Sequence, residues 1–175
     1  MTASDLGLLV LRLVVGLTFA AHGAQKAFGW WSGPGFAGWR AGVERMGLRP
    51  PGFWAVISVA AELVGGVLLA VGLLTPLATA ALVAQSVVII GLVHLPKGFW
   101  MRNGGIEFAM SLAAGVVALV GTGPGSASLD AALGASYSGT VRVAVLAVGV
   151  VGGLIALAIP RVMPVKTAPP ERSSF

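Results

Sequence analysis

Residues 53–95 read FWAVISVAAELVGGVLLAVGLLTPLATAALVAQSVVIIGLVHL, two long apolar runs joined by the pair Thr75-Pro76. The runs cover residues 53–74 and 77–95, and each is close to the ~20 apolar residues that an α-helix needs to cross a bilayer. The short break between them leaves room for nothing but a tight turn. The stretch therefore predicts two antiparallel membrane-spanning helices.

Apolar segments on both sides of this hairpin extend the pattern. They cover residues 5–27, 105–120 and 141–159. A loop rich in Trp and Gly, residues 28–52, precedes the hairpin, and its residues 36–46 are predicted to form a short amphipathic helix at the membrane interface. The fold that we expect is all-α, a transmembrane helix bundle of four core helices plus a fifth C-terminal span.

The composition supports a membrane protein rather than a soluble one. Hydrophobic residues make up 57% of the chain and charged residues 10%, whereas an average soluble domain has about 25% charged residues. Too few polar side chains remain to cover a soluble surface, so lipid must cover it. The chain has no cysteine, which excludes disulfides, thiol redox chemistry and thiolate metal ligands within it. The net charge of +5 includes no dense basic tract, so no nucleic-acid partner is predicted.

The basic residues outside the spans fall into alternate loops. Those after the first and third apolar segments and the C-terminal tail are basic, whereas Arg142, at the edge of the loop after the fourth segment, does not fit the alternation. Because cytoplasmic loops carry an excess of Lys and Arg, five spans place the N-terminus outside and the C-terminus in the cytoplasm. The residues of the basic face are Arg40, Arg45, Arg49, Lys97, Arg102, Arg161, Lys166 and Arg172.

Two ionisable residues, Arg12 and Glu62, lie inside predicted spans. Such side chains are costly in a membrane unless they are paired or hydrated, and they often mark functional sites. At 1.5 Å per residue, Arg12 lies roughly 20 Å and Glu62 roughly 14 Å from the basic face. The side chains of Arg and Glu are long enough to bridge this difference in depth. We therefore expect a buried Arg12–Glu62 ion pair, either as a structural clamp or as part of a functional pocket.

More polar side chains gather at the basic face. The first and third helices end where the second and fourth begin, so residues at these ends converge in any up-and-down bundle. They predict one polar pocket. Taken alone, the cations could be ordinary membrane-flanking residues, and His94 could simply cap a helix end. The set comprises His22, Gln25, Lys26, His94, Lys97, Arg102, Asn103 and Glu107.

The residue types in this pocket indicate several kinds of chemistry. An imidazole beside a carboxylate can transfer protons near neutral pH, and a group of cations attracts anions. The aromatic loop over residues 28–52 could cover a flat hydrophobic ligand such as a quinone. Two histidines with carboxylates could also hold a metal ion, but their spacing forms no tight ligand motif. No metal site is therefore predicted.

Short polar and glycine-containing motifs follow one another along the chain. They are Leu11-Arg12-Leu13, residues 22–30 (HGAQKAFGW), 62–66 (ELVGG), 72–76 (GLLTP), 93–99 (VHLPKGF), 103–107 (NGGIE) and 123–130 (GPGSASLD). As an ordered set, over about residues 6–133, they resemble the DoxX family of membrane proteins. The resemblance divides the chain into a DoxX-like four-helix domain over residues 1–133, an additional membrane helix over 134–160 and a basic tail over 161–175.

The resemblance implies a multi-pass protein of the bacterial or archaeal cytoplasmic (inner) membrane. Relatives named DoxD form part of a thiosulfate:quinone oxidoreductase. Mycobacterial relatives are described as the membrane part of an oxidoreductase complex with a superoxide dismutase and a sulfurtransferase. The recurrent polar positions of the family correspond here to Arg12, His22, Gln25, Lys26, Glu62, His94, Asn103 and Glu107.

We therefore expect a membrane subunit associated with redox chemistry that binds a quinone or a small anion at the polar pocket. In this hypothesis the proton-exchanging, catalytic residues are His22, His94 and Glu107, and the ligand-binding residues are Arg12, Gln25, Lys26, Glu62 and Asn103. One alternative is a non-enzymatic scaffold that recruits soluble oxidoreductase or sulfurtransferase partners through the basic loops. The other is a small transporter, for which the outer half of the bundle offers almost no polar path. The sequence leaves open whether the protein is itself an enzyme and whether it forms a homo-oligomer.

Overall fold

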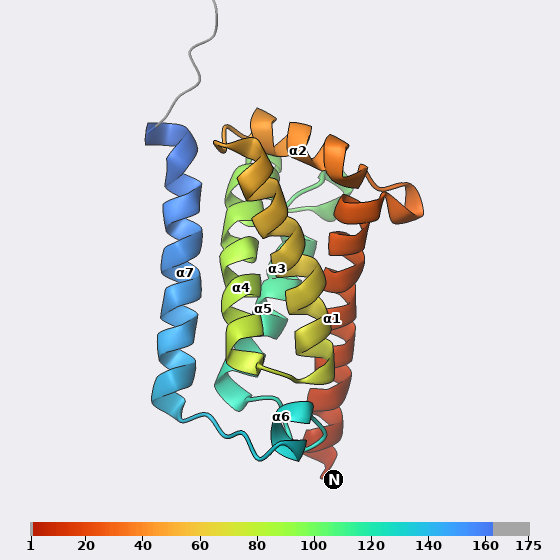
Figure 1. The fold of residues 1–175 in the computed structure, drawn as a ribbon, viewed down its shortest axis with the longest axis vertical. Helices are drawn as coiled ribbons and strands as arrows, with labels where there is room; N and C mark the ends of the chain where they lie inside the picture. Colours follow the sequence, from red (N-terminus) through yellow and green to blue (C-terminus); the bar gives the residue numbers. More distant parts are fainter. Residues whose placement is uncertain (1, 163–175) are drawn as a thin grey trace, which may run out of the picture.

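The structure, a computed structural model, describes residues 2–162, and this part of the chain contains helices and no strand. The expected all-α fold is thereby confirmed. Five long helices run alternately up and down (Figure 1). They are α1 (Ala3–Phe28), α3 (Pro51–Val71), α4 (Thr75–Ile89), α5 (Glu107–Thr122) and α7 (Gly139–Val162). The basic tail predicted for residues 161–175 lies outside the described residues beyond residue 162.

Four helical segments are long and apolar enough to cross a bilayer. They are α1, α3, α7 and the segment Thr75–Lys97, which begins with α4. The helix α5 is apolar but has only 16 residues, about 24 Å at 1.5 Å per residue. The helix α7 covers the predicted fifth span, residues 141–159, and ends at the opposite end of the bundle from the N-terminus (Figure 1). The chain is therefore a multi-pass membrane protein.

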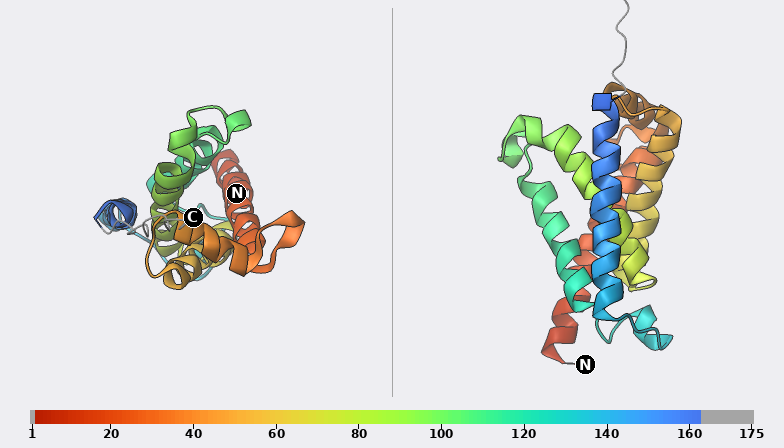
Figure 2. Two further views of the ribbon diagram at one scale, coloured as in Figure 1. Left: turned by 90° about the horizontal axis from the view of Figure 1, so that it is seen from above. Right: turned by 90° about the vertical axis from the view of Figure 1, so that its left-hand side faces the viewer.

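The helices α1, α3, α4 and α5 form a central group, and α7 lies outside it against α4 (Figure 2). The contact between α1 and α3 is the closest, because glycines bring the two backbones together. A Cβ on Gly66 would lie 2.5 Å from the backbone nitrogen of Ala20 and 2.6 Å from the carbonyl oxygen of Gly16. Small residues permit this approach in membranes. The buried core includes Val15, Phe19, Leu69, Leu82, Val116 and Leu119.

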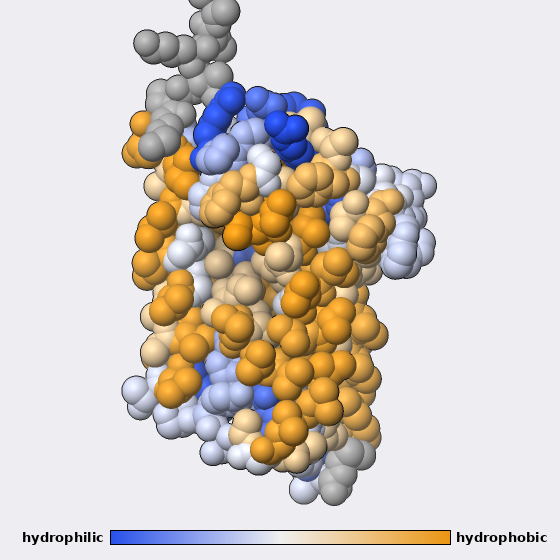
Figure 3. All heavy atoms as spheres, in the orientation of Figure 1, coloured by the Kyte–Doolittle hydropathy of each residue, from blue (hydrophilic) through white to orange (hydrophobic). Residues whose placement is uncertain are grey.

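The two ends of the bundle differ in their short helices. The helix α2 (Gly35–Arg45) crosses the end where α1 finishes and α3 begins (Figure 1), and it confirms the short helix predicted for residues 36–46. We call this the α2 end, and we call the opposite end, which carries α6 (Leu129–Ala132), the α6 end. Figure 3 shows hydrophilic atoms at the α2 end above a broad hydrophobic band. The predicted basic face thus corresponds to the α2 end.

Candidate functional site

A cavity of about 290 Å³ lies among α1, α3, α4 and α5 near the α2 end, with Trp39 of α2 in its wall. We call it the central cavity. Its polar lining consists of His22, Lys26, Glu62, Gln85, Ser86 and His94. The rest of its wall is apolar or aromatic and consists of Phe19, Trp39, Ile89, Val93, Met101, Phe108, Ala109 and Leu112.

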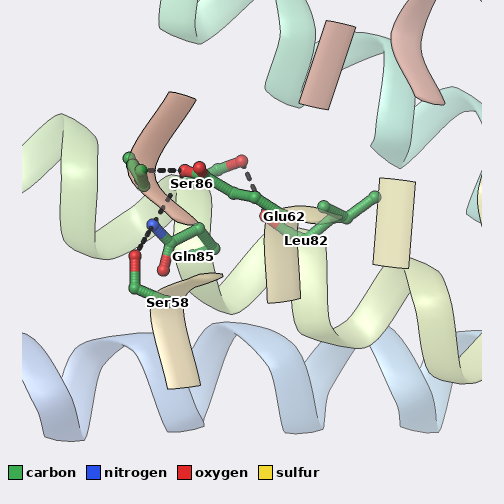
Figure 4. Close-up of polar contacts among 6 residues, drawn as sticks. Ser58, Glu62, Leu82, Gln85 and Ser86 are labelled. Carbon is green, nitrogen blue, oxygen red and sulfur yellow. Dashed lines mark hydrogen bonds and ion pairs between the residues drawn. The ribbon is translucent and has the colours of Figure 1, made fainter. Parts of the chain in front are cut away.

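A buried charge pair forms the polar side of the central cavity. Glu62 is 4% exposed, and its Oε1 lies 2.5 Å from Lys26 Nζ. The same ammonium lies 4.0 Å from the ring centroid of Trp39, a cation–π distance. Gln85 Nε2 donates hydrogen bonds to Glu62 Oε1 at 3.0 Å and to Ser58 Oγ at 2.8 Å (Figure 4). Every donor that reaches Glu62 therefore binds the same carboxylate oxygen.

The second carboxylate oxygen of Glu62 is different. Glu62 Oε2 is buried and accepts no hydrogen bond from any residue in the described part of the chain. A carboxylate oxygen can accept more than one hydrogen bond, and a buried acceptor without a donor costs about 1–3 kcal/mol. Because Glu62 lines the central cavity, Oε2 is an acceptor suited to a ligand that carries a hydroxyl or an N–H group.

His94 lies where the regular helix geometry changes. After α4, the chain forms a π-helical turn over Ile90–His94, and such turns are frequent at functional sites. His94 Nδ1 lies 2.7 Å from the carbonyl oxygen of Gly104. A carbonyl oxygen only accepts, so Nδ1 carries the proton and Nε2 holds the lone pair of the neutral imidazole. The loop before α5 thus prepares His94 as a proton acceptor through Nε2.

His22 closes the central cavity on the α1 side. Its ring packs edge-on against Phe108 of α5, with 5.9 Å between the ring centroids. His22 also borders a shallow groove on the outside of α1, which Gln25 and Trp31 line. Gln25 therefore lies on this outer groove and not on the central cavity.

The predicted ion pair between Arg12 and Glu62 is wrong. Arg12 is 1% exposed, but its terminal nitrogens donate to the carbonyl oxygens of Pro124 and Ala127 at the α6 end, each at 2.6 Å. Helical side chains lean towards the N-terminus of their helix, and the N-terminus of α1 is at the α6 end. Arg12 therefore extends away from Glu62, and Lys26 is the partner of Glu62 instead.

Two other predicted residues, Asn103 in the loop before α5 and Glu107 at the first position of α5, do not line the central cavity. Glu107 Oε2 accepts a hydrogen bond from the backbone N–H of Met101 at 2.9 Å, which stabilises the turn that precedes α5. Asn103 is exposed in a single 3-10 turn. Of the predicted site residues, the structure brings together His22, Lys26, Glu62 and His94.

Sequence reasoning missed the polar residues Gln85 and Ser86 of the central cavity and did not place Trp39 in its wall. Gln85 and Ser86 form a polar pair inside the apolar run 77–95, and their position within a span was a usable signal. Ser86 donates to the carbonyl oxygen of Leu82 at 2.7 Å (Figure 4), as a helical serine often does. Trp39 was assigned to the interface, and its contact with the cavity depends on how α2 folds over the bundle.

A second buried polar cluster occupies the α6 end. Asp130 is 1% exposed, and its carboxylate caps α4 by accepting the backbone N–H groups of Leu74 at 2.8 Å and Thr75 at 2.9 Å. Tyr137 donates its hydroxyl to the same carboxylate at 3.2 Å. Burial opposes ionisation, but the hydrogen bonds from Thr75, Leu74 and Tyr137 outweigh it and lower the pKa of Asp130. This cluster therefore stabilises the fold.

Comparison with known proteins assigns the family. The sequence model of the DoxX family matches residues 7–95, which include most of α1 and all of α2, α3 and α4. The chain belongs to the DoxX family. This match confirms the family that the motifs of the sequence resemble. An uncharacterized membrane protein of Mycobacterium tuberculosis is 32% identical to the chain over 133 residues, which cover 70% of this chain and 78% of that protein. No solved structure matches the chain.

All polar side chains that line the central cavity lie within the DoxX match, whereas the wall from α5 and the whole of α7 lie outside it. Within residues 2–162, no three His, Asp or Glu side chains lie close enough together to hold a metal ion. The polar side chains of the central cavity can form hydrogen bonds and exchange protons with a ligand.

Proposed function

We propose that this DoxX protein binds a quinone, or the corresponding quinol, in the central cavity as a membrane subunit associated with redox chemistry. The observation that carries this proposal is Glu62 Oε2, a buried oxygen that has no donor among residues 2–162 and belongs to a residue of the cavity wall. The same cavity also holds two imidazoles. A quinol has hydroxyl groups that can donate to such an oxygen. Quinones and quinols also dissolve in the lipid that surrounds the hydrophobic band of this bundle.

The local charge favours a neutral ligand over the small anion that the sequence also suggested. The charge of Lys26 is compensated by Glu62 and lies against the ring of Trp39. An anion in the cavity would approach the carboxylate of Glu62. Among the described lining residues, Lys26 is the only Lys or Arg, and it is already paired with that carboxylate. A neutral ring with polar substituents meets no such penalty.

The size and lining of the cavity suit one aromatic or quinonoid ring. Its volume of about 290 Å³ is close to the lower end of small-molecule sites, which span roughly 300–1,000 Å³. Trp39 and Phe108 supply flat apolar surfaces on which a ring can pack. Ligand pockets typically combine such a wall with a few polar groups, as this one does.

The side chains around the cavity can exchange protons with a ligand. A bound quinone supplies the redox chemistry, because it takes up electrons and protons when it is reduced. His94 Nε2 can accept a proton, because Nδ1 donates its hydrogen bond to the carbonyl oxygen of Gly104. Glu62 Oε2 is a second proton acceptor. The chain has no cysteine, so electrons would come from a substrate or from a partner's cofactor.

The proposal is tested with duroquinone and duroquinol, ring compounds without a tail, and purified protein in lipid nanodiscs. We expect the wild-type protein to bind both forms in anaerobic equilibrium dialysis. Glu62→Gln should bind duroquinol about tenfold more weakly, because a hydrogen bond to a charged group contributes about 1.5–3 kcal/mol.

The matched control is Glu107→Gln, the same chemical change at a carboxylate outside the cavity, which should leave duroquinol binding unchanged. Melting temperatures of both variants verify that they remain folded. Absence of duroquinol binding to the wild-type protein, or equal losses in the two variants, would contradict the proposal.

A second candidate function, recruitment of soluble partners, is favoured by the cations at the α2 end. Arg40 and Arg45 are exposed on α2, and neither forms an ion pair with another described residue. An acidic soluble enzyme could bind there by charge complementarity. The variant Arg40→Glu/Arg45→Glu should then lose an oxidoreductase or sulfurtransferase partner in purification from membranes, identified by mass spectrometry, and retain duroquinol binding. Unchanged recovery of such a partner would count against this function.

A further inference from the structure

A second cavity lies between the central group of helices and α7. It has a volume of about 240 Å³ and is bounded by α2, α3, α4 and α7. We call it the side cavity. Its wall is apolar except at Trp39, Trp54, Ser58 and Gln85, and it extends from Ile57 on α3 to Gly152 on α7. It is therefore a largely hydrophobic space with few polar side chains in its wall.

The packing of α7 explains why this space is open. Gly149 and Gly153 bring α7 onto α4, because a Cβ there would lie 2.7 Å from the carbonyl oxygen of Ala80 and 2.8 Å from that of Ala84, respectively. Gly152 lies beside them but has nothing within 4 Å of the position of a Cβ. The helix α7 thus contacts α4 closely and leaves room on the side of α3.

The side cavity adjoins the central cavity. Trp39, Gln85 and Ile89 line both. Gln85 is 7% exposed and bridges the two walls, since its Nε2 donates to Ser58 of the side cavity and to Glu62 of the central cavity (Figure 4). Trp39 Nε1 is buried and has no acceptor among the described residues. The two cavities are therefore neighbours that share three residues of their walls.

The side cavity also reaches the lipid-facing surface. Ile57 is 45% exposed and Gly152 is exposed, so the outer wall of the cavity is part of the molecular surface. Figure 3 looks onto the face between α7 and α3, where hydrophobic atoms are interspersed with paler, less hydrophobic ones above the α6 end. A molecule dissolved in the bilayer can approach this opening sideways without crossing the basic face.

We propose that the side cavity holds the first isoprene units of a polyprenyl quinone whose ring binds in the central cavity. This inference rests on the proposed function. The apolar lining, the lateral position of the opening and the wall shared with the central cavity all fit a hydrocarbon chain attached to a polar ring. The substrate class is thereby narrowed to tailed, membrane-resident quinones.

The tail contributes to binding by packing and not by leaving water. Lipid is as apolar as the cavity wall, so transfer of the tail from lipid into the side cavity releases little hydrophobic free energy. Close contact with Ile57, Ala61 and Gly152 provides van der Waals attraction and fixes the direction in which the tail leaves the ring. Blocking the cavity should therefore displace the tail while the ring can still bind.

The test uses a polyprenyl quinone analogue that carries a photoreactive diazirine on its first isoprene unit, with the full chain in nanodiscs. After irradiation, mass spectrometry should locate the label on α3 around Ile57 and Ala61 and on α7 around Gly152. Gly152→Leu fills the cavity from a position without steric conflict, and it should lower the label on α3 about tenfold. Ala61→Leu, which fills the cavity from the opposite wall, should have the same effect.

The matched control is Gly7→Leu, an exposed position on α1 at which a Cβ also meets nothing within 4 Å. It should leave the labelling unchanged, and duroquinol binding should be unchanged in Gly152→Leu. Duroquinol binding together with a label outside the side cavity, or a label that Gly152→Leu and Ala61→Leu do not lower, overturns this inference alone. Equal labelling of the cavity by a phospholipid with a diazirine in its acyl chain also overturns it. Absence of duroquinol binding to the wild-type protein overturns both proposals.

Discussion

The two ends of the bundle each bury a carboxylate, but the partners of the two carboxylates differ. At the α6 end, both oxygens of Asp130 accept backbone N–H groups, and Arg12 donates to backbone carbonyl oxygens nearby. At the α2 end, Glu62 receives hydrogen bonds from the side chains of Lys26 and Gln85, both on one oxygen. The other oxygen has no donor among the described residues and belongs to a residue of the central cavity wall.

This difference separates a structural cluster from a candidate binding site. Backbone partners are fixed by the fold, so Arg12 and Asp130 join α1, the turn before α4 and the loop after α5 into one unit. Side-chain partners can rearrange, and an open acceptor beside a cavity leaves a position for a ligand. Substitutions at the α6 end should therefore lower the free energy of unfolding, and substitutions at the α2 end should lower the affinity for a ligand.

The largest effect is expected for Arg12→Met. This change leaves the carbonyl oxygens of Pro124 and Ala127 without the donors that Arg12 supplies and removes a buried cation. The free energy of unfolding should fall by about 3–5 kcal/mol, measured by denaturant titration in micelles. Leu13→Met, an exposed neighbour on the same helix, serves as the control. A loss below about 1 kcal/mol would show that the α6 end is not a structural cluster.

Replacing both buried charged residues at each end tests the comparison more directly. In Lys26→Met/Glu62→Met, apolar residues substitute for a charge pair, which is often neutral for stability, so unfolding should change by about 1 kcal/mol or less. Duroquinol binding should nevertheless fall at least about tenfold, because the acceptor is gone.

The corresponding change at the α6 end, Arg12→Met/Asp130→Leu, should not recover the stability lost in Arg12→Met alone. The backbone N–H groups of Leu74 and Thr75 would lose their acceptors in addition to the unpaired carbonyl groups. A double-mutant cycle measured by the same denaturant titration checks this. The comparison would be reversed if Arg12→Met/Asp130→Leu regained stability relative to Arg12→Met, or if Lys26→Met/Glu62→Met lost much of the free energy of unfolding.

The helical architecture was predictable from sequence because the signal is local. Two apolar runs joined by Thr75-Pro76 leave few alternatives to a membrane hairpin, and α7 covers the predicted fifth span. The π-helical turn over Ile90–His94 was not predictable, because nothing in the periodicity of this run marks one additional residue per turn. The direction of α2 across the bundle also depends on contacts between helices that are distant in sequence.

The residue types of the candidate site were predictable from the sequence, but the side chains that interact with one another were less so. Helix ends converge in any up-and-down bundle, which is why His22, Lys26 and His94 were placed together correctly. Depth along a helix identified Arg12 and Glu62 as buried charges but did not give the direction of their side chains. Arg12 is nearer to backbone carbonyl oxygens at its own end than to Glu62, and a loop with free carbonyl groups is not visible as a partner in sequence.

A smaller effect is expected from pH at the α6 end. Because the pKa of Asp130 is lowered in the fold, the stability it contributes is complete above its unfolded pKa of about 3.9 and is lost as pH falls through the lower folded pKa. The melting temperature of the wild-type protein should thus fall between about pH 5 and 3 more steeply than that of Asp130→Asn. Parallel curves for the two proteins would contradict a role for the ionised carboxylate.

The smallest expected effect concerns Tyr137, whose hydroxyl donates to Asp130 Oδ1 at 3.2 Å. In Tyr137→Phe, Oδ1 keeps the backbone N–H of Leu74 and Oδ2 keeps that of Thr75, so the free energy of unfolding should fall by only about 0.5–1.5 kcal/mol. The loss of one donor should also raise the folded-state pKa of Asp130 towards its unfolded value, which makes the acid-induced fall in melting temperature smaller. If Tyr137→Phe instead costs as much as Arg12→Met, the side chain and not the backbone would hold this cluster together. The distinction between the two ends would then no longer stand, because both would depend on side-chain partners.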